Sequence, residues 1–392
     1  MKKRISVLGA TGSIGKNSLD VISRDKDNFE AALLCAHSDS RGLAEISRDW
    51  PDAVCVLCGE EGGKQKLLDA IGGVHADLTI NGIAGGAGLE PSLAAIESGS
   101  DLALANKETI VMAGRLALRL AEEKNVKIIP VDSEHSGVFH LLEAHCAQPS
   151  GNGRPYGGGQ ERADGLIEEV ILTASGGPFR NASLQEMENV SPQDALAHPT
   201  WKMGRKISID SASMANKGLE IIEAAVFFNL PVEKIRVVIH PQSIVHAMVR
   251  LCNGVVFAQL SRPDMRHPIH DALYWPKTAR SGLDPLNFDS LTLEFEKPDL
   301  QRFPMLSLGR EAARRGGLYT CVYNAANEEA VAAFLNMEIG FLDIPRITGY
   351  VLDEDWAGDS CDLQTILKTD TDARRRAAFY IGKKKGNKNA VN

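Results

Sequence analysis

Two carboxylates placed two residues apart follow an apolar run in the first half of the chain. Asp132 and Glu134 come directly after Ile128-Ile-Pro-Val131, which has the pattern of a buried strand. Side chains two apart on an extended segment point to the same side, so both carboxylates can face one point. Oxygen donors of this kind suit a hard divalent cation such as Mg²⁺ or Mn²⁺. Taken alone, the pair is also typical of a solvated strand end.

A second polar group leads into a helix that we expect at about 213–229. The segment runs Ser211-Ala-Ser-Met-Ala-Asn-Lys-Gly-Leu-Glu220, and its side chains with the free N–H groups of a helix start favour an anion site. An ordinary helix cap with a surface ion pair is the alternative, because Lys217 and Glu220 are three apart. The segment just before it, 197–206, carries Trp and Met without periodicity, which indicates a mobile cover.

A glycine-rich turn near the N-terminus predicts a dinucleotide site. Gly9, Gly12 and Gly15 stand between a predicted strand and a helix expected at 16–23, where they let backbone N–H groups approach a pyrophosphate. After the second predicted strand, an acidic residue favours the ribose of NAD, and a basic or small polar set favours the 2′-phosphate of NADP. Both kinds occur here, so the residues alone leave the choice open: Asp39 against His37, Ser38 and Arg41.

The cysteines and histidines argue against two other chemistries. Seven cysteines scattered along the chain form no disulfide framework and suit a reducing compartment. Cys55 and Cys58 have the redox C-x-x-C spacing, but they lie in a strand-like run without the helix start that activates a thiolate, so we expect two unpaired thiols. No pair of histidines has the H-E-x-x-H spacing of a zinc hydrolase.

The predicted elements imply an α/β protein with three parts. Strands and helices alternate through 1–147, which predicts a doubly wound, Rossmann-type dinucleotide-binding domain with a parallel sheet. Residues 148–262 begin with a glycine-rich loop and continue as an α+β catalytic domain, with a lid loop near 197–208. A proline-punctuated linker, 263–304, leads to a small C-terminal helical domain, 305–392, whose basic tail from Lys383 we expect to be solvated and frayed.

Composition excludes several classes of protein. The 392 residues are 44% apolar and 24% charged, as in a soluble globular protein of more than one domain. The net charge of −8 argues against a general nucleic-acid binder. No apolar run reaches the roughly 18 residues that cross a bilayer, and Gly9 interrupts the start too early for a signal peptide, so we expect no membrane association.

Six motifs in order closely resemble the 1-deoxy-D-xylulose 5-phosphate reductoisomerase family. The resemblance runs from Ile5 to about Ile347 and rests on Gly9–Gly15, Ala105-Asn-Lys-Glu108, Val131–Ser136, Thr173–Phe179, Ser211–Glu220 and His240–His246, with Asn324–Glu328 in addition. It implies a metal- and NADPH-dependent rearrangement and reduction of 1-deoxy-D-xylulose 5-phosphate to 2-C-methyl-D-erythritol 4-phosphate, in the non-mevalonate route to isoprenoids. It also implies a cytoplasmic homodimer, joined through the central sheet, that acts on a small phosphorylated sugar.

The resemblance assigns roles to individual residues. The metal, Mg²⁺, Mn²⁺ or Co²⁺, would be held by Asp132, Glu134 and Glu220, and these three with Lys107 form the catalytic group. Further substrate contacts would come from Ser133, Ser175, His198, Ser211, Asn216 and Lys217, with Trp201 and Met203 on the loop that closes over substrate. The nucleotide would be held by Thr11, Gly12, Ser13, Ile14, Asn106, Glu108 and Gly204, together with His37, Ser38 and Asp39.

Two features depart from the family pattern, and other functions stay open. The family usually has a small residue and Asn where this chain has His37 and Asp39, and the loop 151–165 is several residues longer than usual. A short-chain-type sugar-nucleotide reductase or epimerase would need Tyr-x-x-x-Lys, which occurs only at Tyr380 and Lys384. A semialdehyde dehydrogenase would need a catalytic Cys with a partner base. A non-enzymatic NADP sensor would have no use for the three carboxylates.

Overall fold

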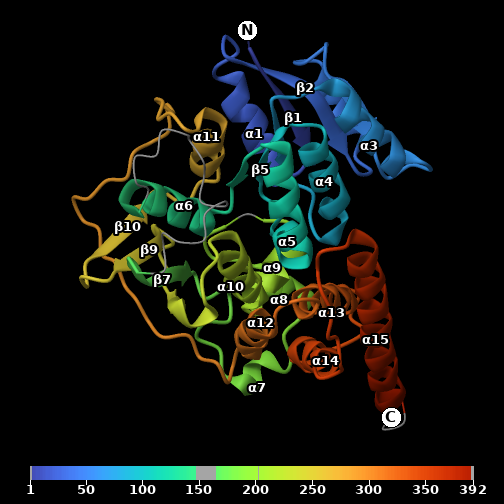
Figure 1. The fold of residues 1–392 in the computed structure, drawn as a ribbon. Helices are drawn as coiled ribbons and strands as arrows, with labels where there is room; N and C mark the ends of the chain where they lie inside the picture. Colours follow the sequence, from blue (N-terminus) through green and yellow to red (C-terminus); the bar gives the residue numbers. More distant parts are fainter. Residues whose placement is uncertain (1, 147–164, 202, 390–392) are drawn as a thin grey trace. The chain divides into compact units, whose positions relative to one another are not determined.

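The computed structural model describes residues 2–146, 165–201 and 203–389, and the chain forms two compact units. Of the described residues, the first unit contains 2–109, 117–146 and 259–289, and the second contains 110–116, 165–201, 203–258 and 290–389. Figure 1 shows the fold coloured along the sequence. The expected glycine-rich loop lies outside the described residues except for Gly165. The central and C-terminal regions, which we expected to be separate domains, fall in the same compact unit.

A six-stranded parallel sheet forms the centre of the first unit. Its strands lie in the order β3-β2-β1-β4-β5-β6, with every neighbouring pair parallel. The chain therefore builds outward from β1 to β3 and then returns to the other side of β1, which confirms the doubly wound prediction. The bounds are β1 Lys3–Leu8, β2 Phe29–Ala36, β3 Val54–Leu57, β4 Leu78–Asn81, β5 Asp101–Leu104 and β6 Ile128–Pro130.

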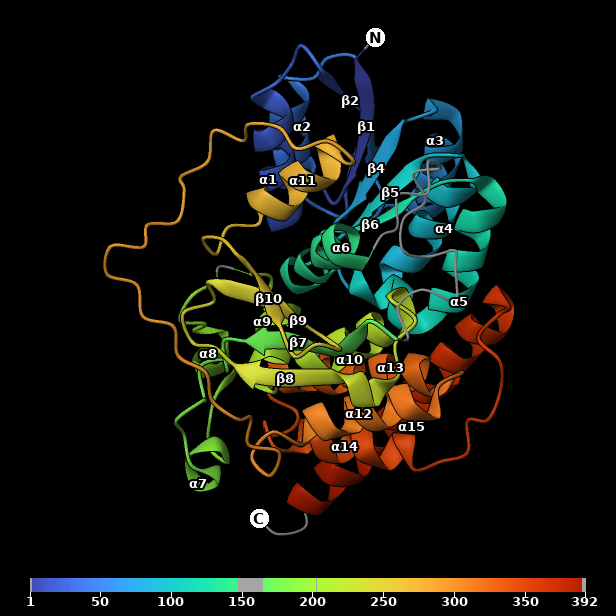
Figure 2. The same cartoon turned by 60° about the vertical axis from the view of Figure 1, so that its left-hand side comes forward.

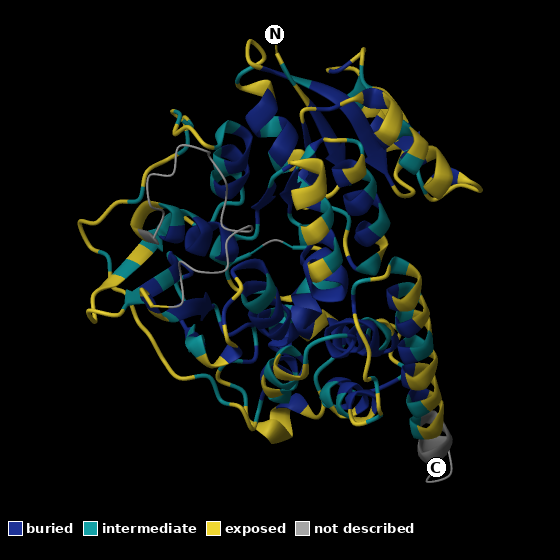
Figure 3. Ribbon diagram, in the orientation of Figure 1, coloured by how far each residue is buried: buried dark blue, intermediate teal, exposed yellow. Residues whose placement is uncertain are grey.

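Helices cover both faces of this sheet because the crossovers run in opposite directions on its two halves. Helices α1 (Ser13–Ser23) and α2 (Ser40–Ser47) lie on one face, and α3 (Gly63–Val74) and α4 (Leu89–Glu97) lie on the other (Figure 2). Buried apolar residues line the strands between them, drawn in dark blue in Figure 3. Two further helices follow β5 and β6, namely α5 (Lys107–Lys124) and α6 (Ser133–Cys146).

The stretch expected to be a linker contains a helix that belongs to the first unit. Helix α11 (Arg266–Tyr274) packs on α1, and Ile269 and Leu273 are buried. Lys3 donates its Nζ to the Leu273 carbonyl at 3.0 Å, and the Tyr274 hydroxyl bonds to Asp25. A proline-punctuated sequence suggested an open connection here, but its apolar residues recur at helical spacing and cover α1.

A four-stranded mixed sheet and a group of helices make up the second unit. The strand order is β10-β9-β7-β8, with β7 parallel to β8 and antiparallel to β9. The strands are β7 Ile167–Ala174, β8 Ile235–Ile239, β9 Val245–Leu251 and β10 Val256–Leu260. The helices are α7 Leu184–Met187, α8 Pro192–Leu196, α9 Arg205–Ala212, α10 Ala215–Phe227, α12 Pro304–Arg315, α13 Tyr319–Leu335, α14 Asp343–Leu352 and α15 Leu363–Asn389.

The basic C-terminal tail is helical where the structure describes it. Helix α15 continues to Asn389, so the expectation of a frayed tail from Lys383 is wrong for most of its length. Lys384 pairs with Asp343 at 3.1 Å, and the Lys383 ammonium lies 4.4 Å from the centre of the Phe379 ring. These contacts stabilise a helix end that polar composition alone would leave solvated.

Helices α10 and α12 meet backbone to backbone within the second unit. A Cβ atom built on Gly309 would lie 2.5 Å from the Gly218 Cα, closer than real Cβ contacts. The Tyr323 hydroxyl lies 3.2 Å from the Ala215 carbonyl oxygen and 3.0 Å from the Met305 carbonyl oxygen, so α13 is fastened to both helices. The first turns of α10 are therefore held in place by α12 and α13.

In the described part of the chain, no helix combines the length and apolar character that crossing a membrane requires.

Replacing Gly309 by Ala should force α10 and α12 apart. Overpacking of this kind costs about 1–3 kcal/mol of unfolding free energy, because the neighbouring atoms are backbone and cannot turn aside. Gly382→Ala is a matched control: it is also a helical glycine, its position is open, and alanine there should stabilise by about 0.5–1 kcal/mol. Denaturant unfolding of both variants measures the difference. Equal stability of the two would contradict the close contact.

Candidate active site

The ends of the parallel strands gather polar residues at one edge of the first sheet. Because β1, β2, β4, β5 and β6 run parallel, the loops that follow them all leave from the same edge. At this edge β1 and β4 are neighbours, but the chain after β1 crosses one face of the sheet and the chain after β4 crosses the other. The two loops therefore diverge, and the edge is split between them. Such a split is where open α/β sheets bind their ligands.

The glycine-rich turn after β1 is held by the strand beside it. Gly9 has a φ of +81°, and the Ala10 N–H donates to the Cys35 carbonyl at 2.7 Å. A Cβ atom on Gly15 would lie 2.3 Å from the Gly9 carbonyl oxygen, so this helix position must stay glycine. Gly12 begins α1 without a capping side chain, and Gly12 and Ser13 are exposed. The N–H groups of the first turn can therefore bind an anion.

The loop after β2 places three predicted nucleotide residues at the surface. His37, Ser38 and Asp39 are all exposed. Asp39 also begins α2, because its Oδ1 accepts from the Gly42 N–H at 2.8 Å. The neighbouring Arg41 pairs with Glu45 at 3.1 Å on the solvent side of α2. The carboxylate of Asp39 thus has a structural partner and is still open to a ligand.

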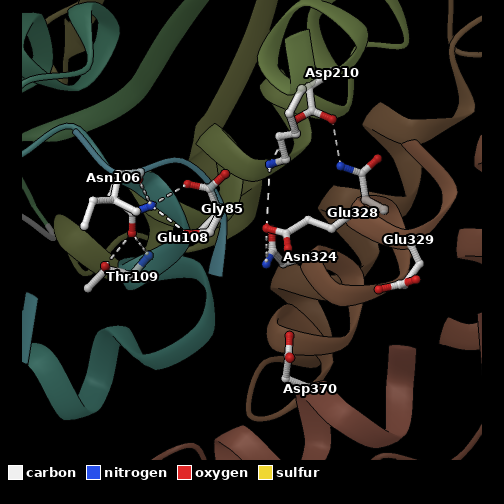
Figure 4. A network of polar contacts seen from close by, with 12 residues as sticks. Gly85, Asn106, Glu108, Thr109, Asp210, Asn324, Glu328, Glu329 and Asp370 are labelled. Carbon is white, nitrogen blue, oxygen red and sulfur yellow. Dashed lines mark hydrogen bonds and ion pairs between the residues drawn. The ribbon is translucent and has the colours of Figure 1, made fainter. Parts of the chain in front are cut away.

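Asn106 and Glu108 are buried and act within the protein itself (Figure 4). The Asn106 amide donates to the Gly85 carbonyl at 2.9 Å and to Glu108 at 3.0 Å, and its oxygen accepts from the Thr109 N–H at 3.0 Å. It therefore caps α5 and fixes the loop that follows β4. A nucleotide contact at this position would be supported by a loop that cannot shift freely.

Asp132 and its neighbours form a compact polar cluster after β6. Lys107 Nζ lies 2.5 Å from Asp132 Oδ2, and the two side chains are only 5% and 13% exposed. Ser133 Oγ donates to Glu134 at 2.5 Å. The expectation of an extended Asp132–Glu134 segment is wrong, because α6 begins at Ser133. Asp132 precedes the helix, and its carbonyl accepts from the Ser136 N–H at 2.8 Å.

Asp132 stays ionised although only 13% of its side chain is exposed. Burial alone would raise the pKa of this carboxyl, but the charge of Lys107 and the proximity of His135 outweigh it, so the pKa lies well below the ordinary 3.8. His135 is fully buried, with Nδ1 at 3.6 Å from Asp132 Oδ1. Sequence reasoning missed His135, although its place three residues after Asp132 puts both on one face of a helix start.

A second cluster belongs to α10 in the other unit. The Asn216 amide donates to Glu220 Oε1 at 2.5 Å, and the Lys217 ammonium pairs with Glu220 Oε2. Glu220 is 1% exposed and Lys217 is 4% exposed. The predicted helix is confirmed, but the residue that introduces it is different: Ser211 lies at the end of α9, and Met214 makes a left-handed turn with a φ of +63° between the two helices.

Ser175 and His198 are paired next to the end of β7. His198 Nδ1 accepts from the N–H groups of Thr200 and Trp201 at 3.1 and 2.9 Å, so its proton resides on Nε2 and is donated to Ser175 Oγ at 3.0 Å. Burial lowers the pKa of His198, which keeps the ring neutral. Ser175 Oγ also accepts from the Gly177 N–H at 3.2 Å, so its own O–H is a donor.

The segment expected to be a lid is partly helical. Residues Trp201, Met203 and Gly204 precede α9, while Arg205 and Lys206 form its first turn. Lys206 pairs with Asp210 at 2.9 Å, four residues further along, a spacing that could have revealed this helix. The ring of Trp201 lies 6.3 Å from that of His246. Lys202 lies outside the described residues.

A buried polar network in the second unit links α9 to the helical region (Figure 4). Asp210 is 1% exposed and accepts from the Asn327 amide of α13 at 2.8 Å. Glu328 pairs with Arg374 of α15 at 2.6 Å, and Arg374 also pairs with Asp370 at 2.7 Å. Asn327 and Glu328 belong to the Asn324–Glu328 motif, whose contribution is therefore to hold α9, the helix that carries Ser211 in its last turn.

These features define a class of protein. A doubly wound parallel sheet, a glycine-rich turn before α1 and a polar cluster at the same sheet edge are the parts of a dinucleotide-dependent enzyme. Family models agree in detail. The model of 1-deoxy-D-xylulose 5-phosphate reductoisomerase matches residues 5–71 and 56–114, its C-terminal domain matches 128–228, and the DXP reductoisomerase C-terminal domain matches 260–376.

Known proteins of this kind are similar along nearly the whole chain. The 1-deoxy-D-xylulose 5-phosphate reductoisomerase of Treponema denticola is 47% identical over 388 residues, covering 97% of both chains, and that of Prosthecochloris aestuarii is 44% identical, covering 96% and 99%. The Zymomonas mobilis enzyme in complex with NADPH superposes with a TM-score of 0.83 at 39% identity, covering 97% and 99% of the chains. A reductoisomerase complex with NADPH, fosmidomycin and magnesium gives 0.85 at 35% identity, covering 97% and 98%. The chain therefore belongs to the 1-deoxy-D-xylulose 5-phosphate reductoisomerase family.

Replacing Lys107 by Met should leave the charge of Asp132 buried without its cation. Breaking a buried pair in this way costs about 3–5 kcal/mol of unfolding free energy. The folded pKa of Asp132 is depressed, so the pair stabilises fully above the unfolded pKa of 3.8, and this stabilisation is lost as the pH falls below it. The stability gap between wild type and Lys107→Met should therefore narrow below about pH 4.

Urea unfolding at several pH values, with EDTA present, measures this gap. Arg119→Met on the same helix is the control. Arg119 and Glu123 form an exposed ion pair, which contributes less than about 0.5 kcal/mol to the free energy of unfolding. A gap for Lys107→Met that is equally large at pH 3 and pH 7 would mean that the loss comes from packing and not from charge.

Proposed function

We propose that this chain converts 1-deoxy-D-xylulose 5-phosphate to 2-C-methyl-D-erythritol 4-phosphate, using NADPH and a divalent cation. The observation that carries the proposal is the ion pair of Asp132 with Lys107, which is only 13% exposed at Asp132 and lies at the edge of a dinucleotide-binding sheet in a member of this enzyme family. A solved relative is described as a complex with NADPH, fosmidomycin and magnesium, so the same cofactor and type of ion are expected here.

The residues at the sheet edge fit a dinucleotide. The close approach of Gly15 to Gly9 leaves no room for side chains, and the uncapped start of α1 offers N–H groups to a pyrophosphate. We assign Thr11, Gly12, Ser13 and Ile14 to this contact and His37, Ser38 and Asp39 to the ribose end. Asn106, Glu108 and Gly204 complete the proposed nucleotide set.

The donor set fits a hard cation. We assign Asp132, Glu134 and Glu220 as ligands, all of them carboxylates, which Mg²⁺ and Mn²⁺ prefer. Both Asp132 and Glu220 have a lysine beside them, so their charges are already balanced within each unit. When bound, the cation polarises neighbouring oxygens of the substrate, and NADPH supplies the hydride.

The remaining polar residues bind and orient the substrate. Lys107 and Ser133 are proposed to lie near the reacting carbons, where the Lys107 ammonium holds a proton close to developing negative charge. Ser175, His198, Ser211, Asn216 and Lys217 are proposed to bind the phosphate. The Nε2–H of His198 donates to Ser175, which leaves the Ser175 O–H as a donor for a phosphate oxygen and supports this role. An anchored phosphate lets binding energy orient the fragments during rearrangement.

Trp201 and Met203 are proposed to cover the bound substrate. They lie in the non-helical segment before α9, and Trp201 is half-buried against His246. A cover of this kind excludes water from the reacting carbons. We further propose a cytoplasmic homodimer joined through the sheet of the second unit, as the family resemblance implies.

The competing short-chain reductase has no support from the residues that it requires. Tyr380 and Lys384 lie on α15, where the Tyr380 hydroxyl bonds to Glu354 at 3.4 Å and Lys384 pairs with Asp343. Both side chains are thus engaged with the helical region of the second unit.

The proposed activity is tested directly by NADPH consumption with 1-deoxy-D-xylulose 5-phosphate. Oxidation of NADPH should require the substrate, stop with EDTA and return with Mg²⁺ or Mn²⁺. Activity that EDTA leaves unchanged would contradict the metal, and no consumption under any condition would contradict the enzyme.

Glu134→Gln should reduce turnover by more than about a hundredfold, because loss of supporting groups around a metal already costs about 10- to 100-fold. Mn²⁺ affinity should fall with it, while stability should change little, since Glu134 is only half-buried. Glu220→Gln should also lose activity, but with a loss of stability, because it removes the negative charge that faces the buried Lys217 ammonium. Glu123→Gln, on the surface of α5, is the control. Normal turnover and Mn²⁺ affinity in Glu134→Gln would remove it from the ligand set.

Asp39→Asn should strengthen NADPH binding by up to about tenfold, because it removes a negative charge near the 2′-phosphate. Asn is also a good helix cap, so the bond to Gly42 can persist and stability should hold. NADH binding should change little, which makes the NADPH-to-NADH affinity ratio the measurement. Asp49→Asn, exposed after α2, controls for a general charge effect. An unchanged ratio would mean that Asp39 does not face the phosphate.

A further inference from the structure

Helix α13 contacts both sides of the turn that joins α9 to α10. The Asn327 amide donates to Asp210 Oδ1 at 2.8 Å near the end of α9 (Figure 4). The Tyr323 hydroxyl lies 3.2 Å from the carbonyl oxygen of Ala215, the first residue of α10. Because Tyr323 and Asn327 are four residues apart, both side chains lie on the same face of α13. One face of α13 therefore holds the turn at its start and at its end.

Three of the residues proposed to bind the phosphate lie next to these contacts. Ser211 directly follows Asp210, while Asn216 and Lys217 directly follow Ala215. A residue joined to a fixed neighbour by a planar peptide bond has little freedom to move. The positions of the three side chains relative to one another therefore depend on the contacts that α13 makes.

Hydrogen bonds inside the turn connect its two held ends. The Ser213 hydroxyl donates to the Asp210 carbonyl at 3.3 Å and accepts from the Ala215 N–H at 3.3 Å. Met214 between them has a φ of +63°, a conformation that a residue other than glycine keeps only when its surroundings fix it. The internal bonds and the contacts with α13 together fix one conformation of the turn.

The loop that carries Ser175 packs against the same turn. Gly177 has a φ of +67°, and a Cβ atom built on it would lie 2.8 Å from the Ser211 carbonyl oxygen. The Gly177 N–H donates to Ser175 Oγ at 3.2 Å. Ser175 is thus placed by a glycine that touches the backbone of Ser211. A shift of the turn would therefore also move a fourth residue of the proposed phosphate site.

The bond between Asp210 and Asn327 lies out of reach of water. Asp210 is 1% exposed and Asn327 is fully buried. Lys206 lies 2.9 Å from Asp210 Oδ2, so the carboxylate is held from two sides. A hydrogen bond to a buried charge is costly to lose, because no water replaces the missing donor. A change at Asn327 should therefore displace the end of α9.

We propose that Tyr323 and Asn327 are positioning residues for the phosphate of the substrate. They set the spacing of Ser211, Asn216 and Lys217 before the substrate arrives. The inference rests on the proposed function, which assigns these three residues to the phosphate. A donor set that is already in place binds an anion without the entropy cost of ordering a loop. Loosening either contact should therefore weaken binding of the phosphate group.

Exchanging two side chains tests the Asp210–Asn327 bond. Asn327→Asp places a second carboxylate against Asp210, and the two like charges repel. The double variant Asp210→Asn with Asn327→Asp restores one amide and one carboxylate in exchanged positions, and its amide oxygen can still accept from Lys206. Tyr323→Phe removes only the hydroxyl of the second contact, and it serves even if Asn327→Asp does not fold. Asn336→Asp, exposed at the end of α13, is the control.

NADPH consumption with 1-deoxy-D-xylulose 5-phosphate gives KM and kcat, and competitive inhibition by inorganic phosphate gives a Ki for the phosphate site. Asn327→Asp should raise the substrate KM and the phosphate Ki by about tenfold, which corresponds to one charge-assisted hydrogen bond. Tyr323→Phe should raise both by about three- to tenfold, as for one neutral hydrogen bond. The kcat should change less than KM, because the phosphate is remote from the reacting carbons.

Two further results are expected if the effect is local to the phosphate. The double variant and Asn336→Asp should both have the substrate KM and the phosphate Ki of wild type. The KM for NADPH should not change in any variant, since most of its proposed contacts belong to the first unit.

The outcomes separate this inference from the function on which it rests. A wild type that consumes no NADPH with the substrate, or that inorganic phosphate does not inhibit, contradicts the proposed function. An active Asn327→Asp or Tyr323→Phe that unfolds at lower urea but keeps the substrate KM and the phosphate Ki of wild type overturns the positioning role. A raised KM that the double variant does not restore, or an equal rise in the KM for NADPH, overturns it as well.

Discussion

A buried carboxylate keeps its negative charge only when a cation or several donors stand beside it. Each unit of this protein meets that constraint with its own residues: Lys107 beside Asp132 in the first, and Lys217 with Asn216 beside Glu220 in the second. The charges are therefore ready before any metal arrives, and no unit must fold around an ion.

The nucleotide edge depends on a similar kind of local support. The glycine-rich turn is shaped by absent side chains, since Gly15 touches the backbone of Gly9, and it is held by bonds to Cys35 of the neighbouring strand. Asn106 fixes the loop after β4 on the other side of the split. The residues that shape the site therefore include several that need not touch a ligand at all.

Much of this architecture could be predicted from local patterns. The parallel sheet follows from apolar runs that alternate with helical periodicity, and the glycine spacing marks the turn after β1. Two helix starts were missed because their residues also resemble strand ends and loops: Asp132 caps α6, and Gly204 precedes α9. The neighbour of Asp132 could not be predicted, because Lys107 comes from another part of the sequence and meets it only through the order of the strands.

The contact between Gly218 and Gly309 makes the crossing of α10 and α12 rigid. With no side chains between them, α10 and α12 have no soft layer in which to slide or rotate, and Tyr323 closes the junction from a third helix. Asn216, Lys217 and Glu220 lie on α10, so their spacing is fixed by the same contact. Differences in ligand shape must then be absorbed by other segments, and sequence diversity compatible with activity should be scarcest where these helices cross.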